Sequence, residues 1–294
     1  MRAFDYSAPQ TLNDAIALLA KKGERARVLS GGTDLIVQVR EKRRELDLMV
    51  DVKRIPELLE IRFDAAGLTL GASVPCHRIY EDPVIRRAYP GLVDAAFLIG
   101  GIQIQNRASL GGNVCNASPA ADSTPALIVH HATCVIAGVD GRRELPVEQF
   151  CLAPGRNALG RGELLVSFHI PAPPPRFSAS YIRFIPRNEM DIAVVGCGVS
   201  LSLAEDLQTV TSARLALGAV APTPLLVAEA AVALVGQPLS AQTIDKAAAA
   251  AQAASRPISD MRGTAEYRRH LVGVLARRTV QKAFERAKEA VHAN

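Results

Sequence analysis

The chain has 294 residues, of which 49% are hydrophobic and 21% charged, with 21 glycines and 18 prolines. This composition excludes a disordered or collagen-like chain, and the length allows either one large domain or two smaller ones, each with a real core. The net charge of +5 comes from dispersed basic residues. Because no nucleic-acid-binding motif accompanies them, we expect no nucleic acid partner.

The five cysteines lie at scattered positions and form no Cys-X-X-Cys pair: Cys76, Cys115, Cys134, Cys151 and Cys197. Their odd number and spacing argue against a disulfide framework, and against a zinc or iron–sulfur site built by this chain alone. The sequence contains no apolar run long enough to span a membrane, and its first residues do not resemble a secretory signal. We therefore expect a cytoplasmic protein with no membrane span and no metal site.

The first 55 residues have the pattern of a small α/β unit. A helix is predicted to begin at Thr11 and to end at Gly23, because apolar residues recur at helical spacing and two lysines precede the glycine. A strand over 27–29 leads directly into a glycine-containing loop, a second helix is predicted from Leu35, and another strand is predicted over 48–52.

Between residue 55 and about residue 170 the pattern favours strands with helical interruptions. Strands are expected over 67–72, 134–137 and 164–170. Two helical pieces, separated at Pro90, are expected between 82 and 97. Thr124 is expected to cap a further helix, because a proline follows it at the first helical position.

The run Pro171-Ala172-Pro173-Pro174-Pro175 is predicted to be a linker, because proline fixes φ and lacks an amide proton. After it, two strands over 192–203 and 210–220 are expected to pair antiparallel. The remainder is predicted to be helical, over 243–255 and 265–292. The apolar stripe of the last helix is formed by Ala276, Val280, Ala283, Phe284, Ala287 and Val291.

Two glycine pairs are the strongest candidates for a binding function. The first, Ser30-Gly31-Gly32-Thr33-Asp34, follows a strand directly, and its glycines allow the backbone to approach a bulky anion closely. The second lies in the segment 109–122, which is rich in Gly, Asn, Ser and Asp and suits a phosphorylated or polyhydroxylated ligand. Each segment alone is also typical of a turn or loop that satisfies its own backbone.

Several common catalytic motifs are missing from the sequence. It has no GxGxxG dinucleotide fingerprint, no GxxxxGK[ST] phosphate loop, no GxSxG and no HExxH. We expect His130 and His131, at the end of an apolar helix, to be packed or surface residues rather than ligands, and Cys115 to be a small buried filler. No catalytic residue is predicted.

Taken together, the two glycine motifs resemble the flavin motifs of the FAD-binding medium subunit of molybdenum hydroxylases, the group of xanthine dehydrogenase and carbon monoxide dehydrogenase. The resemblance rests on Ser30-Gly31-Gly32-Thr33-Asp34-Leu35, on Ser109-Leu110-Gly111-Gly112-Asn113 and on the Asn116–Asp122 segment, and it covers nearly the whole chain. It implies an α+β fold. A FAD-binding domain of the PCMH type, residues 1–175, would contain two α/β subdomains (about 1–55 and 56–175). A C-terminal domain, residues 176–294, would carry a three-stranded antiparallel sheet and helices.

The resemblance also implies where FAD would bind, between the two subdomains. The diphosphate would be wrapped by the backbone of Val28, Leu29, Ser30, Gly31, Gly32, Thr33, Asp34 and Leu35. Ser109, Gly111, Gly112 and Asn113 would hold its other side and the ribityl region. Ribityl or adenosine hydroxyls would bind Asn116, Ser118 and Asp122, and the isoalloxazine edge would meet the backbone of Leu165 and Val166. Arg183 is the nearest match to a basic flavin contact of some relatives, and Ser30 stands where the motif usually has Ala.

The function implied is that of an electron-transfer subunit. Such a chain takes electrons from a small partner subunit with two [2Fe-2S] clusters, in a complex whose large subunit carries a molybdenum–pterin, and passes them to a terminal acceptor. A dimer of heterotrimers is the expected assembly. Two alternatives remain open: a stand-alone FAD-dependent oxidase or reductase of the related fold, and a non-catalytic assembly factor. The substrate and the terminal acceptor are not indicated by the sequence.

Overall fold

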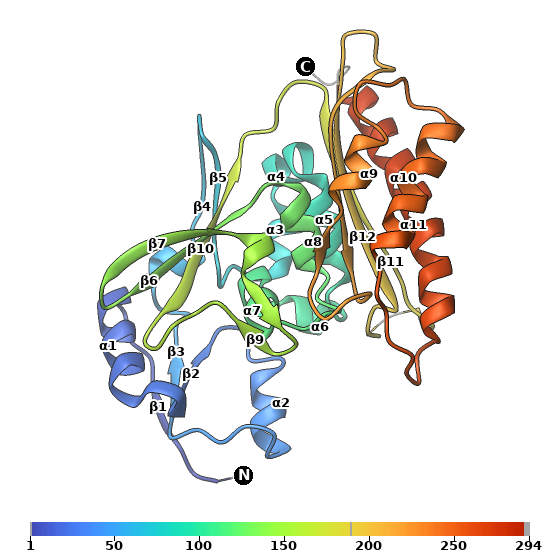
Figure 1. Ribbon diagram of the computed structural model, residues 1–294. Helices are drawn as coiled ribbons and strands as arrows, with labels where there is room; N and C mark the ends of the chain where they lie inside the picture. Colours follow the sequence, from blue (N-terminus) through green and yellow to red (C-terminus); the bar gives the residue numbers. More distant parts are fainter. Residues whose placement is uncertain (1, 189, 291–294) are drawn as a thin grey trace.

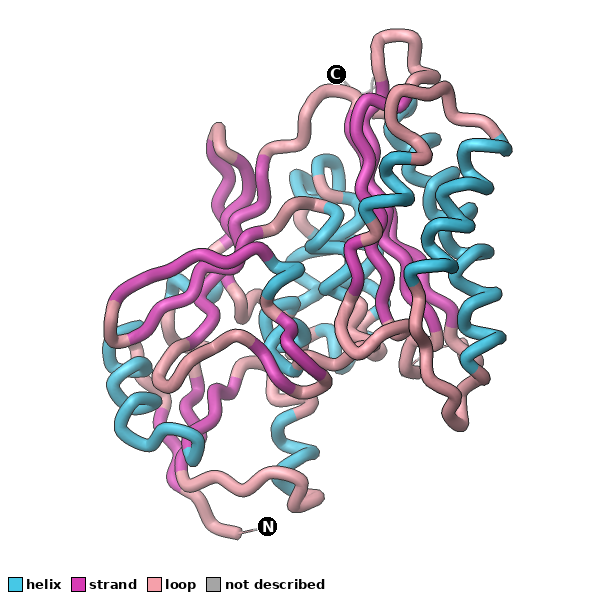
Figure 2. Tube along the Cα trace, in the orientation of Figure 1, coloured by secondary structure: helices cyan, strands magenta, loops and turns pink. Residues whose placement is uncertain are grey.

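The computed structural model describes residues 2–188 and 190–290. The chain passes from a small N-terminal unit, through a larger sheet with helices, to a C-terminal sheet covered by two long helices (Figure 1). Its strands gather into separate three-, five-, four- and two-stranded sheets, drawn in magenta in Figure 2. The expected α+β class is confirmed.

The N-terminal unit is built on a parallel sheet with the strand order β1-β3-β2. Its elements are β1 (Asp5–Ser7), α1 (Leu12–Lys22), a 3-10 turn (Gly23–Arg25), β2 (Ala26–Leu29), α2 (Leu35–Arg40) and β3 (Leu48–Asp51). The predicted first helix is confirmed, with Thr11 accepting the Asp14 amide and Gly23 adopting a φ of +57° at its end. Because β2 and β3 are parallel, their carboxyl ends lie side by side, which brings Ser30 next to Asp51.

The second unit is built on an antiparallel sheet with the order β4-β5-β10-β6-β7. Its strands are β4 (Ile61–Asp64), β5 (Gly67–Gly71), β6 (Thr133–Gly138), β7 (Gly141–Pro146) and β10 (Leu164–Pro171), with a separate pair, β8 (Cys151–Ala153) and β9 (Arg156–Asn157). Its helices are α3 (Cys76–Glu81), α4 (Pro83–Ala88), α5 (Pro90–Leu98), α6 (Ile102–Gln105), α7 (Leu110–Asn116) and α8 (Ser123–Val129), with 3-10 turns at Pro56–Leu59 and Val147–Gln149. The expected strands and the helix break at Pro90 are confirmed.

One helix start in this unit differs from the prediction. Helix α8 begins at Ser123, so Asp122 rather than Thr124 is its N-cap residue. The reason is that Asn113 Oδ1 accepts both the Ser123 amide, at 3.2 Å, and the Ser123 hydroxyl, at 2.7 Å. This neighbouring side chain therefore takes over the capping role that the sequence suggested for Thr124.

The C-terminal unit follows residues 172–176 and contains an antiparallel sheet with the order β11-β12-β13-β14. Its elements are β11 (Phe177–Phe184), β12 (Val195–Leu203), β13 (Val210–Gly218), β14 (Leu225–Leu226), α9 (Ala228–Val232), α10 (Ala241–Ala254) and α11 (Ala265–Glu289). The three long strands agree with the expected sheet, to which β14 adds a two-residue fourth strand. The parts of the predicted last helix at Val291 and His292 lie outside the described residues.

The C-terminal sheet is covered on both faces. Helix α11 packs against β11 and β12 on one face, whereas α5 and α8 of the preceding unit pack on the other (Figure 1). All nine residues of β12 are buried as a result. Glycines allow this close packing, because a Cβ atom at Gly198 would lie 2.9 Å from the Pro125 carbonyl oxygen of α8.

No helix among residues 2–188 and 190–290 combines the length and the apolar character needed to cross a membrane.

Candidate functional site

The structure brings the two glycine motifs into direct contact. The hydroxyl oxygens of Ser30 and Ser109, 79 residues apart in the sequence, lie 3.1 Å from each other. Gly31 packs so tightly beside them that a Cβ atom would stand 2.2 Å from the Arg107 carbonyl oxygen. Gly32 has a φ of +79°, which favours glycine. The first loop is thus held against the backbone that leads into the second.

The two glycines of the second motif have different surroundings. Ser109 caps α7, its hydroxyl accepting the Gly112 amide at 3.1 Å. A Cβ atom at Gly111 would lie 2.3 Å from the Ala72 carbonyl oxygen, so this glycine is required by packing. A Cβ atom at Gly112 would meet only the Ser109 hydroxyl within 4 Å. Apart from this one tight contact, at 3.2 Å, and the backbone of its own helix, the space beside Gly112 is free of protein atoms, and a bulky group can approach the backbone there.

A charged network at the end of β3 holds the Ser30 carbonyl of the first loop. Lys53 Nζ donates to the Ser30 carbonyl oxygen at 3.0 Å and to Asp51 Oδ1 at 2.7 Å, while the Tyr6 hydroxyl donates to Asp51 Oδ2 at 2.7 Å. Burial acts to raise the pKa of Asp51, but these hydrogen bonds outweigh it and hold the pKa below its ordinary value. Sequence reasoning missed all three residues. The only signal was a carboxylate at the end of a buried strand.

The last residue of α7 is tied to the N-terminal unit. Gln38 of α2 donates from Nε2 to Asn116 Oδ1 at 3.1 Å, and its own Oε1 accepts Arg44 Nε at 2.7 Å. Asn116 therefore lies between the two units, at the border where the sequence places the ligand. Gln38 and Arg44 were not predicted as site residues.

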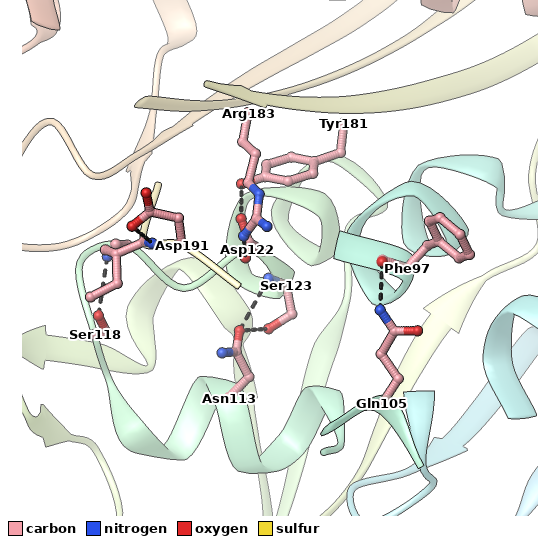
Figure 3. A network of polar contacts seen from close by, with 11 residues as sticks. Phe97, Gln105, Asn113, Ser118, Asp122, Ser123, Tyr181, Arg183 and Asp191 are labelled. Atoms are coloured by element: carbon pink, nitrogen blue, oxygen red, sulfur yellow. Dashed lines mark hydrogen bonds and ion pairs between the residues drawn. The ribbon is translucent and has the colours of Figure 1, made fainter. Parts of the chain in front are cut away.

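Asp122 and Arg183, predicted as separate ligand contacts, form a buried ion pair with each other (Figure 3). Arg183 donates to Asp122 Oδ2 at 2.6 Å, and the Tyr181 hydroxyl donates to Oδ1 at 2.8 Å. The side chains of Arg183 and Asp122 are 5% and 8% exposed. Burial raises the pKa of Asp122 to about 6, although Arg183 and Tyr181 oppose that shift. The Arg183 Nε atom is buried without a hydrogen-bond partner.

Tyr181, which donates to Asp122, is itself held through the Asp94 carboxylate. The Tyr181 amide donates to Asp94 Oδ2 at 3.0 Å, and Arg286 of α11 donates to the same carboxylate at 2.7 Å. The Tyr181 hydroxyl reaches Asp122 past Gly196, where a Cβ atom would lie 2.4 Å from the phenol oxygen. Tyr181 therefore connects helix α11 to the end of the second glycine motif.

The remaining predicted residues lie near the two motifs but have other local partners. Val28 and Leu29 belong to β2, Thr33 and Asp34 form the turn after it, and Leu35 begins α2. The Ser118 hydroxyl accepts the Ala120 amide at 3.3 Å. The side chains of Leu165 and Val166 are buried, and the Val166 carbonyl accepts the Ala72 amide at 2.9 Å, at a register shift in β10.

Of the histidine and cysteine candidates, His130 is buried, Cys115 is half-buried and His131 is exposed. His130 is buried beside Tyr89 and Phe177, and burial lowers its pKa to about 3. Burial also raises the pKa of the Cys115 thiol to about 12, so little thiolate is present at neutral pH. Among residues 2–188 and 190–290, no cluster of three or more His, Cys, Asp or Glu side chains is arranged to hold a metal ion.

Comparison with known proteins links both parts of the chain to one kind of complex. Residues 2–173 match the family described as the FAD binding domain in molybdopterin dehydrogenase, and residues 180–283 match the CO dehydrogenase flavoprotein C-terminal domain. The carbon monoxide dehydrogenase medium chain of Afipia carboxidovorans is 33% identical over 97% of this chain and 98% of its own. The xanthine dehydrogenase FAD-binding subunit of Escherichia coli O157:H7 is 32% identical over 96% of each chain.

A solved structure has the same fold. A chain of carbon monoxide dehydrogenase from Hydrogenophaga pseudoflava superposes with a TM-score of 0.93 at 31% identity, covering 97% of this chain and 98% of that one. The similarity therefore extends over nearly the full length of both chains, and the family match over residues 2–173 includes both glycine motifs.

Proposed function

Because this chain belongs to the family of FAD-binding flavoprotein subunits of molybdopterin dehydrogenases, we propose that it binds one FAD and transfers electrons between a partner subunit and a terminal acceptor. We assign FAD binding to residues 1–175, with subdomains of about 1–55 and 56–175, and a C-terminal flavoprotein domain to residues 176–294. The similar proteins are subunits of dehydrogenases, and we propose that this chain likewise works as the flavoprotein subunit of an oxidoreductase complex.

The contact between the Ser30 and Ser109 loops is the observation that carries the FAD proposal. It joins two glycine-rich backbones into one surface, and Gly112 opens onto space that a side chain would fill. Such backbones expose amide groups to a diphosphate with no Cβ atom in the way. In this proposal the residues from Val28 to Leu35 contact one side of the diphosphate, and Ser109, Gly111, Gly112 and Asn113 contact the other.

The other proposed contacts follow the chain away from the diphosphate. Asn116, Ser118 and Asp122 would bind ribityl or adenosine hydroxyls, the backbone of Leu165 and Val166 would face the isoalloxazine edge, and Arg183 would lie near the flavin. Both carboxylate oxygens of Asp122 already accept hydrogen bonds from Tyr181 and Arg183. In the proposal, Asp122 therefore positions Arg183 as well as any hydroxyl it binds.

The protein contributes position and electrostatics to the reaction. FAD, when bound, accepts and releases electrons one or two at a time. In this proposal the chain's own groups hold the cofactor, and Asp122 compensates the Arg183 charge at neutral pH. His130 remains neutral inside the core, where its lowered pKa and packing give it no part in proton transfer.

We propose that the electrons come from a small subunit with two [2Fe-2S] clusters, in a complex whose large subunit holds a molybdenum–pterin cofactor. The similar Hydrogenophaga structure is that of a carbon monoxide dehydrogenase which lacks the Mo-pyranopterin moiety of the molybdenum cofactor, and this chain covers 98% of the matched chain in it. The match therefore spans nearly all of that solved chain. A dimer of heterotrimers is the assembly we propose.

The test combines a spectrum with co-purification. The purified chain, incubated with FAD and desalted, should be yellow with flavin absorbance bands, and a colourless protein would contradict the proposal. Tagged chain expressed from its native gene neighbourhood should retain a large partner with molybdenum and a small partner with iron. If the yellow chain purifies without these partners and oxidises or reduces a substrate by itself, the stand-alone flavoenzyme is correct instead.

A further inference from the structure

A continuous series of hydrogen bonds runs from the N-terminal strand to both glycine motifs. It begins at the Tyr6 hydroxyl, passes through Asp51 and Lys53 to the Ser30 carbonyl, and crosses from the Ser30 hydroxyl to Ser109. The Ser109 hydroxyl then accepts the Gly112 amide at 3.1 Å. Every distance in the series lies between 2.7 and 3.1 Å.

Lys53 occupies the central place in this series. Its ammonium group is held by the Asp51 carboxylate, which also accepts the Lys53 backbone amide at 3.0 Å. The Tyr6 hydroxyl occupies the other oxygen of Asp51, so the carboxylate is held from both sides. The side chains of Asp51 and Lys53 are 11% and 27% exposed, which strengthens these charge-assisted bonds relative to surface pairs.

The bond to the Ser30 carbonyl has a consequence for the next residue. A trans peptide unit is planar, so its N–H points opposite to its C=O. Because Lys53 holds the Ser30 carbonyl, the Gly31 N–H must point away from Lys53. Glycine peptides otherwise rotate easily, since no Cβ atom restricts them. Lys53 thereby selects one orientation for the first amide of the loop.

We propose that Lys53, held by Asp51 and Tyr6, is a positioning residue of the FAD site that sets the amide groups of the Ser30–Leu35 loop for the diphosphate. This inference rests on the proposed function. Lys53 acts through the Ser30 carbonyl, and it aligns the first glycine loop with the second through the Ser30–Ser109 contact.

The test is isothermal titration of FAD into the FAD-free full chain. Lys53→Met should raise the Kd for FAD about tenfold, equivalent to about 1.4 kcal/mol, because the loop amides lose their fixed orientation. Lys53→Arg, which keeps a cationic donor, should stay within about threefold of the unsubstituted chain. Lys246→Met, at an exposed lysine of α10, removes the same charge elsewhere and should change nothing.

The thermal midpoint of each FAD-free variant separates positioning from folding. Lys53→Met should keep its midpoint within about 3 °C of the unsubstituted chain, because Lys53 is 27% exposed and Asp51 keeps the Tyr6 hydroxyl and the backbone amide of residue 53 as partners. A Kd within twofold of the unsubstituted value would overturn the inference. The inference would also be overturned if Lys53→Arg bound FAD as weakly as Lys53→Met and both variants had equally lowered thermal midpoints. That result would indicate that Lys53 has only a structural role.

A second variant keeps the inference testable if Lys53→Met does not fold. Tyr6→Phe removes one hydroxyl from a residue that is 59% exposed, and should raise the Kd about threefold. An unchanged Kd in this variant, together with an unfolded Lys53→Met, would overturn the inference. If the unsubstituted chain binds no FAD, both the proposed function and this inference are wrong. If Lys53→Met and Tyr6→Phe both bind FAD as tightly as the unsubstituted chain, only the inference about Lys53 is wrong, and the proposed function stands.

Discussion

The two glycine motifs have similar compositions but are supported in different ways. The Ser30–Leu35 loop is only partly buried, follows an edge strand, and is held by the side chain of Lys53. The Ser109–Asp122 segment begins on a buried N-cap and ends on a buried ion pair that the C-terminal sheet supplies through Tyr181 and Arg183. The charged support of the first motif is the single side chain of Lys53, whereas that of the second motif depends on the packing of two units.

Because of this difference, substitutions at the two motifs should have different effects on the affinity for FAD and on the stability of the fold. Substitutions around the first motif should change the affinity for FAD while leaving the fold intact. Substitutions at the far end of the second motif should destabilise the protein itself, because they disturb charges buried between α8 and the C-terminal sheet. Each of the following variants tests this separation.

The largest expected effect comes from Arg183→Met. The variant leaves Asp122 buried with only Tyr181 as a partner, and breaking a buried pair in this way costs about 3–5 kcal/mol. Urea unfolding of the FAD-free chain measures the loss. A second substitution, Asp122→Asn, added to Arg183→Met should recover part of the stability, because it removes the uncompensated charge. A loss below about 1 kcal/mol would show that the second motif does not depend on the pair.

The two adjacent glycines of α7 give a matched comparison inside the second motif. Gly112→Val should weaken FAD binding at least 100-fold, about 2.7 kcal/mol, with the fold retained, because the only side-chain atom near its Cβ is the Ser109 hydroxyl at 3.2 Å, which can shift. Gly111→Ala should destabilise the protein by about 1–3 kcal/mol, because its Cβ atom would collide with the Ala72 carbonyl. Normal FAD binding by Gly112→Val would place the diphosphate elsewhere.

The pH dependence of stability should reveal the burial of Asp122. Its pKa rises from an ordinary 3.8 to about 6 on folding, so between these values the folded protein holds a proton that the unfolded chain has lost. The contribution of this group to stability is therefore greatest below pH 4 and is lost as the pH rises through 6. The free energy of unfolding, measured for the unsubstituted chain and for Asp122→Asn, should differ in slope over this window. Parallel curves would contradict the shifted pKa.

The smallest expected effect is that of Ser30→Ala. The variant removes the hydroxyl bond to Ser109 but keeps the Ser30 carbonyl that Lys53 holds. A bond between two neutral hydroxyls contributes little net free energy, so the Kd for FAD should rise about twofold to threefold. The same titration measures the change in Kd. A rise of tenfold or more would show that the Ser30–Ser109 contact, rather than Lys53, aligns the two loops.

Local features of the fold were predictable from the sequence. Both glycine pairs, the helix ending at Gly23 and the antiparallel partners β12 and β13 follow from residue types and spacing over short distances. The predicted cap at Thr124 was wrong, because the side chain of Asn113, from another helix, accepts the Ser123 amide at the start of α8. Such long-range capping leaves no trace in the local pattern.

The candidate site was predictable as a set of residues but not as a set of contacts. Lys53 could not be recognised, because its role depends on β3 lying between β1 and β2. Asp122 and Arg183 were both identified, yet their pairing depends on the C-terminal sheet packing closely on α8, which glycines of β12 allow. Gly111 and Gly112 look alike in the sequence, and only the position of Ala72 separates their roles.

The central claim is that the two glycine motifs form one diphosphate site. A crystal structure of the full chain with FAD bound tests it most directly. The account predicts diphosphate oxygens within hydrogen-bonding distance of amide groups from both the Ser30–Leu35 loop and the first turn of α7, next to Gly112. A diphosphate that contacts only one of the motifs, or an FAD bound away from both, would contradict it.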